Sequence, residues 1–146
     1  MDSQEKIKKY LKKFVWLFFI FLAFYFFVNI FNYFDPLNFC SIKIDGDFLR
    51  GNENTIKKAI KLLKKEDRVA YKTLCAYIDT ISEHNCFTSS RNFSKEDWDK
   101  DGCYIKGSRA IYLKTEEGES DFIVNKRKTA IKKLSEYSKD FWRGVR

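Results

Sequence analysis

The sequence predicts an α+β protein in which one N-terminal transmembrane helix precedes a small disulfide-stabilised domain of about three helices and a small antiparallel sheet. Three observations favour this fold class: an uncharged apolar stretch, four cysteines that all follow it, and mixed helical and strand-like patterns in the rest of the chain. We therefore divide the chain into a basic segment (1–13), a membrane span (14–34), a linker (35–39) and an α+β domain (40–146).

The apolar stretch is long enough to cross a bilayer. It holds nine of the 15 phenylalanines, carries no charge from Phe14 to Val28, and continues past Asn29 and Asn32 to Phe34. As a helix it would be about 30 Å long, which is the thickness of the hydrocarbon core. A helix that is apolar on every face does not suit the surface of a small soluble domain. We interpret residues 14–34 as an anchor whose partner is the lipid bilayer.

A cleaved signal peptide is the main alternative, because a basic segment precedes the apolar core. Cleavage requires small residues at an A-x-A-like site. The region from Asn29 to Pro36 reads "NIFNYFDP" and offers no such site. We therefore expect the anchor to stay on the protein.

The charges beside the span predict its orientation. Five lysines precede it, whereas the residues that follow carry only Lys43 and Arg50 against three aspartates. The positive-inside rule then keeps the N-terminus in the cytoplasm and places the C-terminal domain outside. The five lysines are Lys6, Lys8, Lys9, Lys12 and Lys13.

All four cysteines lie in the part that we expect outside. An even number in an oxidising compartment indicates two disulfides, for which three pairings are possible. We favour Cys86–Cys103, which closes a polar loop, together with Cys40–Cys75, which ties the start of the domain to its helical part. Buried free thiols are an alternative. A zinc site is a weaker one, because the C-x2-C and C-x4-C spacings are absent and His84 is the only histidine.

Periodicity places the elements of the outer domain. "CSIKID" over residues 40–45 alternates like a strand, and "CYIKG" and "RAIYLK" look like two strands of a hairpin joined around Gly107 and Ser108. Apolar residues at helical spacing predict three helices, over about 54–65, 66–83 and 120–142.

One acidic loop resembles the first half of a calcium-binding loop. In "DWDKDG", Asp97, Asp99 and Asp101 occupy alternate positions, and Gly102 would supply a sharp turn. The bidentate glutamate at position 12 is missing, because Ser108 stands there. We expect either a weak calcium site or a solvated acidic turn that leads into the hairpin, and we expect no other cofactor.

The basic residues favour a surface role over nucleic-acid binding. The net charge of +8 is spread over several helix faces and forms no dedicated groove. The partners that we consider are an envelope polymer, anionic lipid or another membrane protein. "NFS" at Asn92 is a glycosylation acceptor only in a host that glycosylates. The lysine-rich helix faces carry Lys57, Lys58, Lys61, Lys64, Lys65, Lys126, Arg127, Lys128, Lys132 and Lys133.

The stretch "DGCYIKGSRAIYLK", with the later helix ending "IKKLSEYSKDFW", resembles small single-span envelope proteins related to zincin-like metallopeptidases. The resemblance covers about residues 70–142. It implies a shortened, inactive relative, because the HExxH helix is missing and no zinc ligand or catalytic glutamate can be carried over.

Catalytic patterns are nearly absent, since the sequence has no HExxH, G-x-S-x-G or phosphate-binding glycine loop. We therefore expect a membrane-anchored, non-catalytic binding or structural domain. The alternative is a degenerate peptidase-like or other envelope hydrolase.

Overall fold

The computed structural model describes residues 2–45, 52–83 and 98–145, and within these it leaves out the side chains of residues 2–6, 27–31, 52 and 98–99. The chain forms two compact units, Met1–Asn32 and Tyr33–Arg146, and each is described by itself.

The first unit is helix α1, Asp2–Phe31. Its described apolar side chains, among them Phe14, Trp16 and Phe21, are exposed within the unit. The helix ends before the predicted end at Phe34, because residues Asn32–Asp35 form strand β1, in which Tyr33 and Asp35 are buried. No helix in the part of the chain that the structure describes is both long enough and apolar enough to cross a membrane.

The second unit is built on a mixed sheet with the strand order β1-β2-β3-β6-β5-β4. Parallel pairing joins β2 (Cys40–Asp45) to β3 (Thr80–Glu83), and β3 to β6 (Ala110–Leu113). Antiparallel pairing joins β6 to β5 (Gly102–Tyr104) and β5 to β4 (Trp98–Asp99). The prediction of a small antiparallel sheet is therefore wrong for the centre of the sheet, where β2, β3 and β6 are parallel. A helical crossover between β2 and β3 makes those strands parallel.

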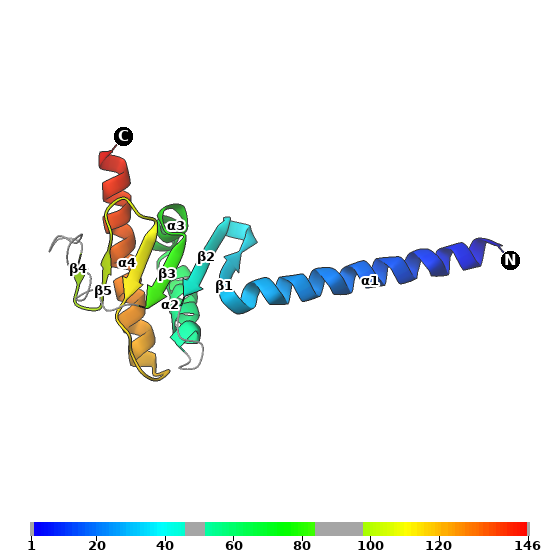
Figure 1. Cartoon of the computed structure of the whole chain (residues 1–146), viewed down its shortest axis with the longest axis horizontal. Helices are drawn as coiled ribbons and strands as arrows, with labels where there is room; N and C mark the ends of the chain where they lie inside the picture. The colour runs from blue at the N-terminus through cyan, green and yellow to red at the C-terminus, as the bar shows by residue number, and fades with distance from the viewer. Residues whose placement is uncertain (1, 46–51, 84–97, 146) are drawn as a thin grey trace. The chain divides into compact units, whose positions relative to one another are not determined.

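Three helices follow the β1–β2 segment and contact one another along one side of the sheet (Figure 1). They are α2 (Asn52–Glu66), α3 (Arg68–Tyr77) and α4 (Asp121–Gly144), in line with the expected three. The predicted strand at 40–45 and the hairpin around Gly107, which has a φ of 81°, are also confirmed. The side chains of Ile42, Ile81, Ile111 and Ile131 are fully buried between the helices and the sheet.

The predicted helix over residues 66–83 is wrong in its second half. Helix α3 ends at Tyr77, Ile78 is extended, and β3 begins at Thr80. Ile78 and Ile81 are both fully buried, and their spacing of three residues is that of a helix stripe. Pairing with β2 and β6 decides the outcome here.

Helix α4 packs closely on the sheet where β5 carries a glycine. A Cβ on Gly102 would lie 2.4 Å from the Tyr112 carbonyl oxygen and 2.9 Å from Leu134 Cδ1. Gly102 is therefore needed mainly for the close pairing of β5 with β6, and it lies in strand β5 and not in the sharp turn that the sequence suggested.

Gly102→Ala should lower the free energy of unfolding by about 1–3 kcal/mol, because the added methyl group would clash with the Tyr112 carbonyl of β6 and crowd Leu134 of α4. Denaturant unfolding of the full chain, followed by near-UV circular dichroism, measures the change. Gly144→Ala is the matched control, since no atom lies within 4 Å of a Cβ there. Equal losses in the two variants would contradict the close packing at Gly102.

Candidate functional site: a charged cluster beside the Cys40–Cys75 disulfide

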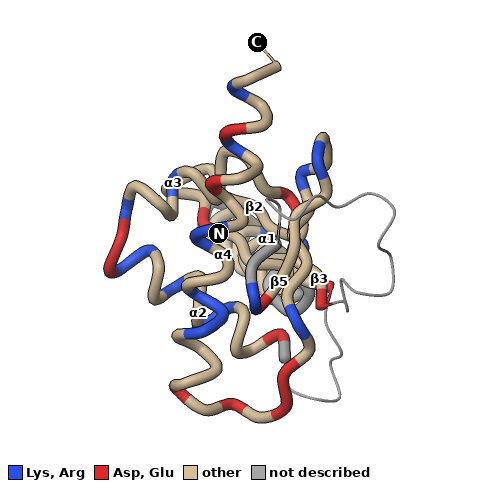
Figure 2. The backbone as a smooth tube through the Cα atoms, turned by 90° about the vertical axis from the view of Figure 1, so that its left-hand side faces the viewer, with Lys and Arg blue, Asp and Glu red and all other residues tan. Residues whose placement is uncertain are grey.

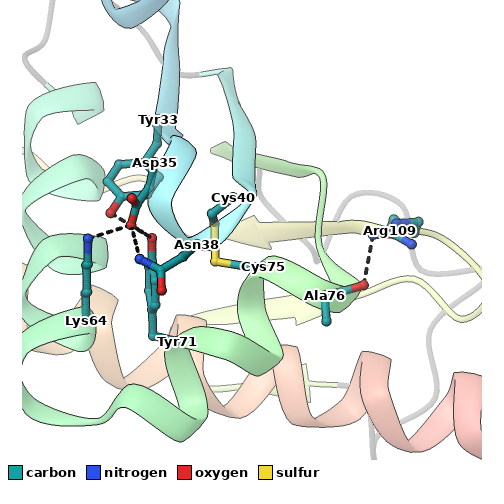
Figure 3. Close-up of a disulfide and its surroundings, with 9 residues drawn as sticks. All are labelled: Tyr33, Asp35, Asn38, Cys40, Lys64, Tyr71, Cys75, Ala76 and Arg109. Carbon is teal, nitrogen blue, oxygen red and sulfur yellow. Dashed lines mark hydrogen bonds and ion pairs between the residues drawn. A yellow bond between two sulfur atoms is a disulfide. The ribbon is translucent and has the colours of Figure 1, made fainter.

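A buried carboxylate, Asp35, joins the first strand of the domain to two helices. Its neighbours are Tyr33 on β1, Asn38 in the short 3-10 helix η1 (Pro36–Asn38), Lys64 on α2 and Tyr71 on α3. We call these five residues the Asp35 cluster. Figure 3 shows their side chains pointing toward one another next to the disulfide.

One oxygen of Asp35 accepts three hydrogen bonds. Lys64 Nζ and the Tyr71 hydroxyl each lie 2.6 Å from Asp35 Oδ2, and Asn38 Nδ2 lies 2.8 Å from it. The hydroxyls of Tyr33 and Tyr71 are 3.1 Å apart, which extends the network to the first inward-facing residue of β1. The Asp35 side chain is only 7% exposed, whereas that of Lys64 is 36% exposed.

The local sequence explains how these groups meet. Tyr33 and Asp35 are two residues apart on a strand, so both point to the helix-covered side. Lys64 lies in the last turn of α2, where a cation complements the helix dipole. A disulfide between Cys40, at the start of β2, and Cys75, near the end of α3, closes the same junction.

The electrostatics hold each group of the cluster in one protonation state. Burial alone would raise the pKa of Asp35, but the hydrogen bonds from Lys64, Tyr71 and Asn38 lower it to about 2. The hydrogen bond to Asp35 raises the pKa of Lys64. Burial, together with the bond to the Asp35 carboxylate, raises the pKa of Tyr71 well above its usual range. At neutral pH, Asp35 is therefore ionised, Lys64 is charged and Tyr71 is neutral.

This arrangement is better suited to holding the start of the domain in place than to proton transfer. A general acid or base works best with a pKa near the operating pH, and the pKa values of Asp35, Lys64 and Tyr71 are all displaced away from neutrality. The cluster fixes the start of the domain to α2 and α3 by charge-assisted hydrogen bonds.

The predicted disulfide Cys40–Cys75 is confirmed, with a Cα–Cα distance of 4.9 Å. Cys86 lies outside the described residues, so the pairing Cys86–Cys103 stays a prediction. Cys103 is fully buried on β5, and none of the described cysteines is a free thiol. His84 and Asn92 also lie outside the described part of the chain.

Among the residues that the structure describes, the predicted calcium ligands do not form a cluster. Asp97 lies outside the described residues, and Asp99 ends β4. Asp101 is buried in the turn between β4 and β5, where its Oδ1 lies 3.1 Å from Lys126 Nζ. Among the described residues, no cluster of three metal-ligating side chains occurs. The Lys126 ammonium group thus lies beside Asp101, where a bound calcium ion would have to be. The calcium site stays a prediction.

Most of the predicted lysine-rich faces are engaged by acidic side chains. Lys126 pairs with Glu116 as well as with Asp101, and Figure 2 shows basic and acidic positions interspersed along the helices. Further pairs of the same kind are Lys58–Glu119, Lys128–Glu66 and Lys132–Asp67. The surface is therefore mixed in charge and not a continuous basic face.

A second buried ion pair was missed by sequence reasoning. Glu83, the last residue of β3, pairs with Arg127 of α4, and both side chains are at least 96% buried. The sequence pattern predicts Arg127 on the solvated, lysine-rich face of its helix. The partners are 44 residues apart, so no local pattern could reveal the contact.

No family model, curated protein or solved structure matches this chain. The resemblance to zincin-related envelope proteins therefore stays a prediction.

Asp35→Asn should lower the free energy of unfolding by about 2 kcal/mol at pH 7, because it removes a buried charge that accepts three hydrogen bonds. The pKa of Asp35 is lower in the folded chain than the ordinary value of 3.8. The stabilisation is therefore complete above about pH 4 and is lost as the pH falls toward 2. Denaturant unfolding at several pH values measures the difference.

The stabilities of the wild type and of Asp35→Asn should converge as the pH falls through that window. Asp45→Asn, at an exposed carboxylate on β2, is the matched control and should have little effect at any pH. A pH-independent gap between wild type and Asp35→Asn would count against the charged cluster.

Replacing Cys40 and Cys75 together by alanine should lower the free energy of unfolding by about 3–4 kcal/mol, because the bridge closes a loop with a sequence separation of 35. Unfolding of the full chain without reductant measures the loss. Ser41→Ala, at an exposed position of the same strand, should leave stability unchanged. An unaltered midpoint in the double variant would show that the bridge does not form.

Proposed function

We propose that this protein is a membrane-tethered binding domain whose second unit lies outside the cytoplasm. The observation that carries the proposal is the direct succession of an apolar helix and a covalently closed domain. Helix α1 ends at Phe31, and Tyr33 and Asp35 already belong to the buried network of the second unit. The chain leaves no long flexible linker between them.

The composition of α1 supports a tether in lipid. Large apolar side chains project from every face of its described part and bury nothing there, and the apolar sequence continues as "FVNIF" over residues 27–31. With β1 assigned to the domain, residues 14–31 remain for the span, and the side chains of 27–31 lie outside those that the structure describes. Their length of about 27 Å is within the usual range for membrane helices.

The lysines and the disulfide support the outer placement. Five lysines lie in the first 13 residues. The described residues between α1 and α2, which are 32–45, carry one lysine, Lys43, against Asp35 and Asp45. A disulfide such as Cys40–Cys75 persists in oxidising compartments and is rare in the cytoplasm. Both features independently favour the same orientation.

The surface supports a polar partner over a polyanion. Ion pairs engage many lysines of α2 and α4, so the helices present mixed charge. On the side of β2 away from the helices, Ser41, Lys43 and Asp45 are exposed. Such a surface recognises a neutral envelope polymer or another membrane protein through hydrogen bonds, whereas anionic lipid alone would favour an unpaired basic face.

A phosphatase that is active only after export, fused after Arg146 and expressed in a bacterial host, should be active, because the positive-inside rule sends this end out. The same enzyme fused before Met1 should be inactive. Replacing Lys6, Lys8, Lys9, Lys12 and Lys13 by glutamine should reduce the activity of the C-terminal fusion several-fold. The opposite pattern in the two fusions, or release of the chain from membranes by alkaline carbonate, would overturn the proposal.

A further inference from the structure

Exposed apolar side chains gather in the short segment that follows α1. Leu37 and Phe39 are 87% and 95% exposed, and Phe34 beside them is 39% exposed. Leu37 and Phe39 belong to residues 36–39, which we call the apolar turn. The other large apolar side chains that are exposed in the described part of the second unit stand singly: Val69 on α3, Phe122 at the start of α4 and Val145 at its end.

The apolar turn is held firmly on both sides. Asn38 Nδ2 donates to the buried Asp35 carboxylate at 2.8 Å, and the Phe39 amide donates to the Pro36 carbonyl at 3.4 Å. The next residue, Cys40, is fully buried and covalently bonded to Cys75. Leu37 and Phe39 are therefore presented to the outside by a fixed backbone.

The backbone at Phe39 opposes folding. It has φ 51° and ψ 39°, the left-handed conformation, which is disfavoured for a bulky aromatic residue. An exposed ring in a strained conformation contributes no burial within the domain that would compensate. Strain of this kind at a fixed, exposed position indicates a role in contact with something else.

The position of the apolar turn in the chain identifies what that contact is. The apolar stretch that we propose as the membrane tether ends at Phe31. From Phe31 to Phe39 the chain makes five extended steps and three 3-10 steps, a span of about 23 Å at most. The headgroup layer at each side of a bilayer is about 5–8 Å thick. Leu37 and Phe39 therefore lie within about 23 Å of the point at which the tether leaves the hydrocarbon core.

The charges around the apolar turn permit entry into that layer. Residues 36–39, "PLNF", carry no charge. The adjoining Asp35 is buried and neutralised by Lys64, so no unpaired carboxylate would be desolvated. Lys64 is partly exposed and can direct its ammonium group toward lipid phosphates while it keeps its bond to Asp35.

We propose that the apolar turn inserts Leu37 and Phe39 into the headgroup region of the bilayer and so fixes the outer domain against the membrane. This inference rests on the proposed function, because it requires α1 to lie in the lipid. It adds a second, independent membrane contact that belongs to the folded domain.

Photo-crosslinking of the full chain in vesicles of a zwitterionic phospholipid tests both ideas separately. The crosslinker p-benzoylphenylalanine is introduced in place of Phe21 on α1, of Phe39 in the apolar turn, or of Phe122 at the start of α4. Phe122 is the matched control, because it is an exposed phenylalanine of the same domain. Mass spectrometry after irradiation reports the phospholipid adduct.

We expect adducts at positions 21 and 39, with at least a tenfold lower yield at 122. An adduct at 21 without one at 39 overturns the inference and leaves the proposed function standing. Absence of an adduct at 21 overturns the proposed function and the inference with it. Equal yields at 39 and 122, or a crosslink from 39 to a second protein chain in place of lipid, also overturns the inference.

The strain argument has its own measurement. Phe39→Asn should raise the melting temperature of the full chain in detergent, because asparagine tolerates the left-handed conformation and no packing is lost. Leu37→Asn, which changes an exposed side chain without relieving strain, should leave the melting temperature unchanged. An unchanged or lower melting temperature for Phe39→Asn would show that asparagine relieves no strain at this position, and would overturn the strain argument.

Discussion

A carboxylate can stay ionised inside a protein only if donors replace the water that it loses, and the beginning of this domain is arranged to meet that demand for Asp35. The donors come from η1, α2 and α3, so satisfying one oxygen fixes three segments relative to β1. The disulfide adds a covalent link between β2 and α3 at the same junction. Strand β1, an edge strand that pairs with β2, is thus attached through its side chains as well.

The same physical principle recurs between the sheet and α4. Glu83 at the end of β3 and Arg127 of α4 are both buried, and each charge is tolerable only because the other is present. Around them, Lys126, Lys128 and Lys132 of α4 reach acidic groups on three other segments. A helix that looks like a solvated basic face in the sequence is instead a main connector of the domain.

Local sequence patterns predict much of the fold correctly. The stripe of Ile56, Ile60 and Leu63 identifies α2, and the alternation in "CSIKID" identifies β2, because each pattern reflects burial on one side of one element. Strand β3 was missed because Ile78 and Ile81, three residues apart, match the helical period, and only the pairing with β2 and β6 reveals the strand. Asp35, next to a proline, had the features of a linker residue. Its donors Lys64 and Tyr71 are 29 and 36 residues away, so the cluster could not be found from spacing.

The position of the Cys40–Cys75 bond has a mechanical consequence. If α1 is held in a membrane and the far end of the domain is held by a partner, tension enters the domain at Tyr33 and travels along β1 and η1 to Cys40. There the covalent bond passes the load directly to Cys75. Residues 41–74, which include most of β2, all of α2 and most of α3, carry no tension. Under load the domain can therefore lose only its first few residues before the force reaches α3, and the part of the fold that the disulfide closes keeps its length.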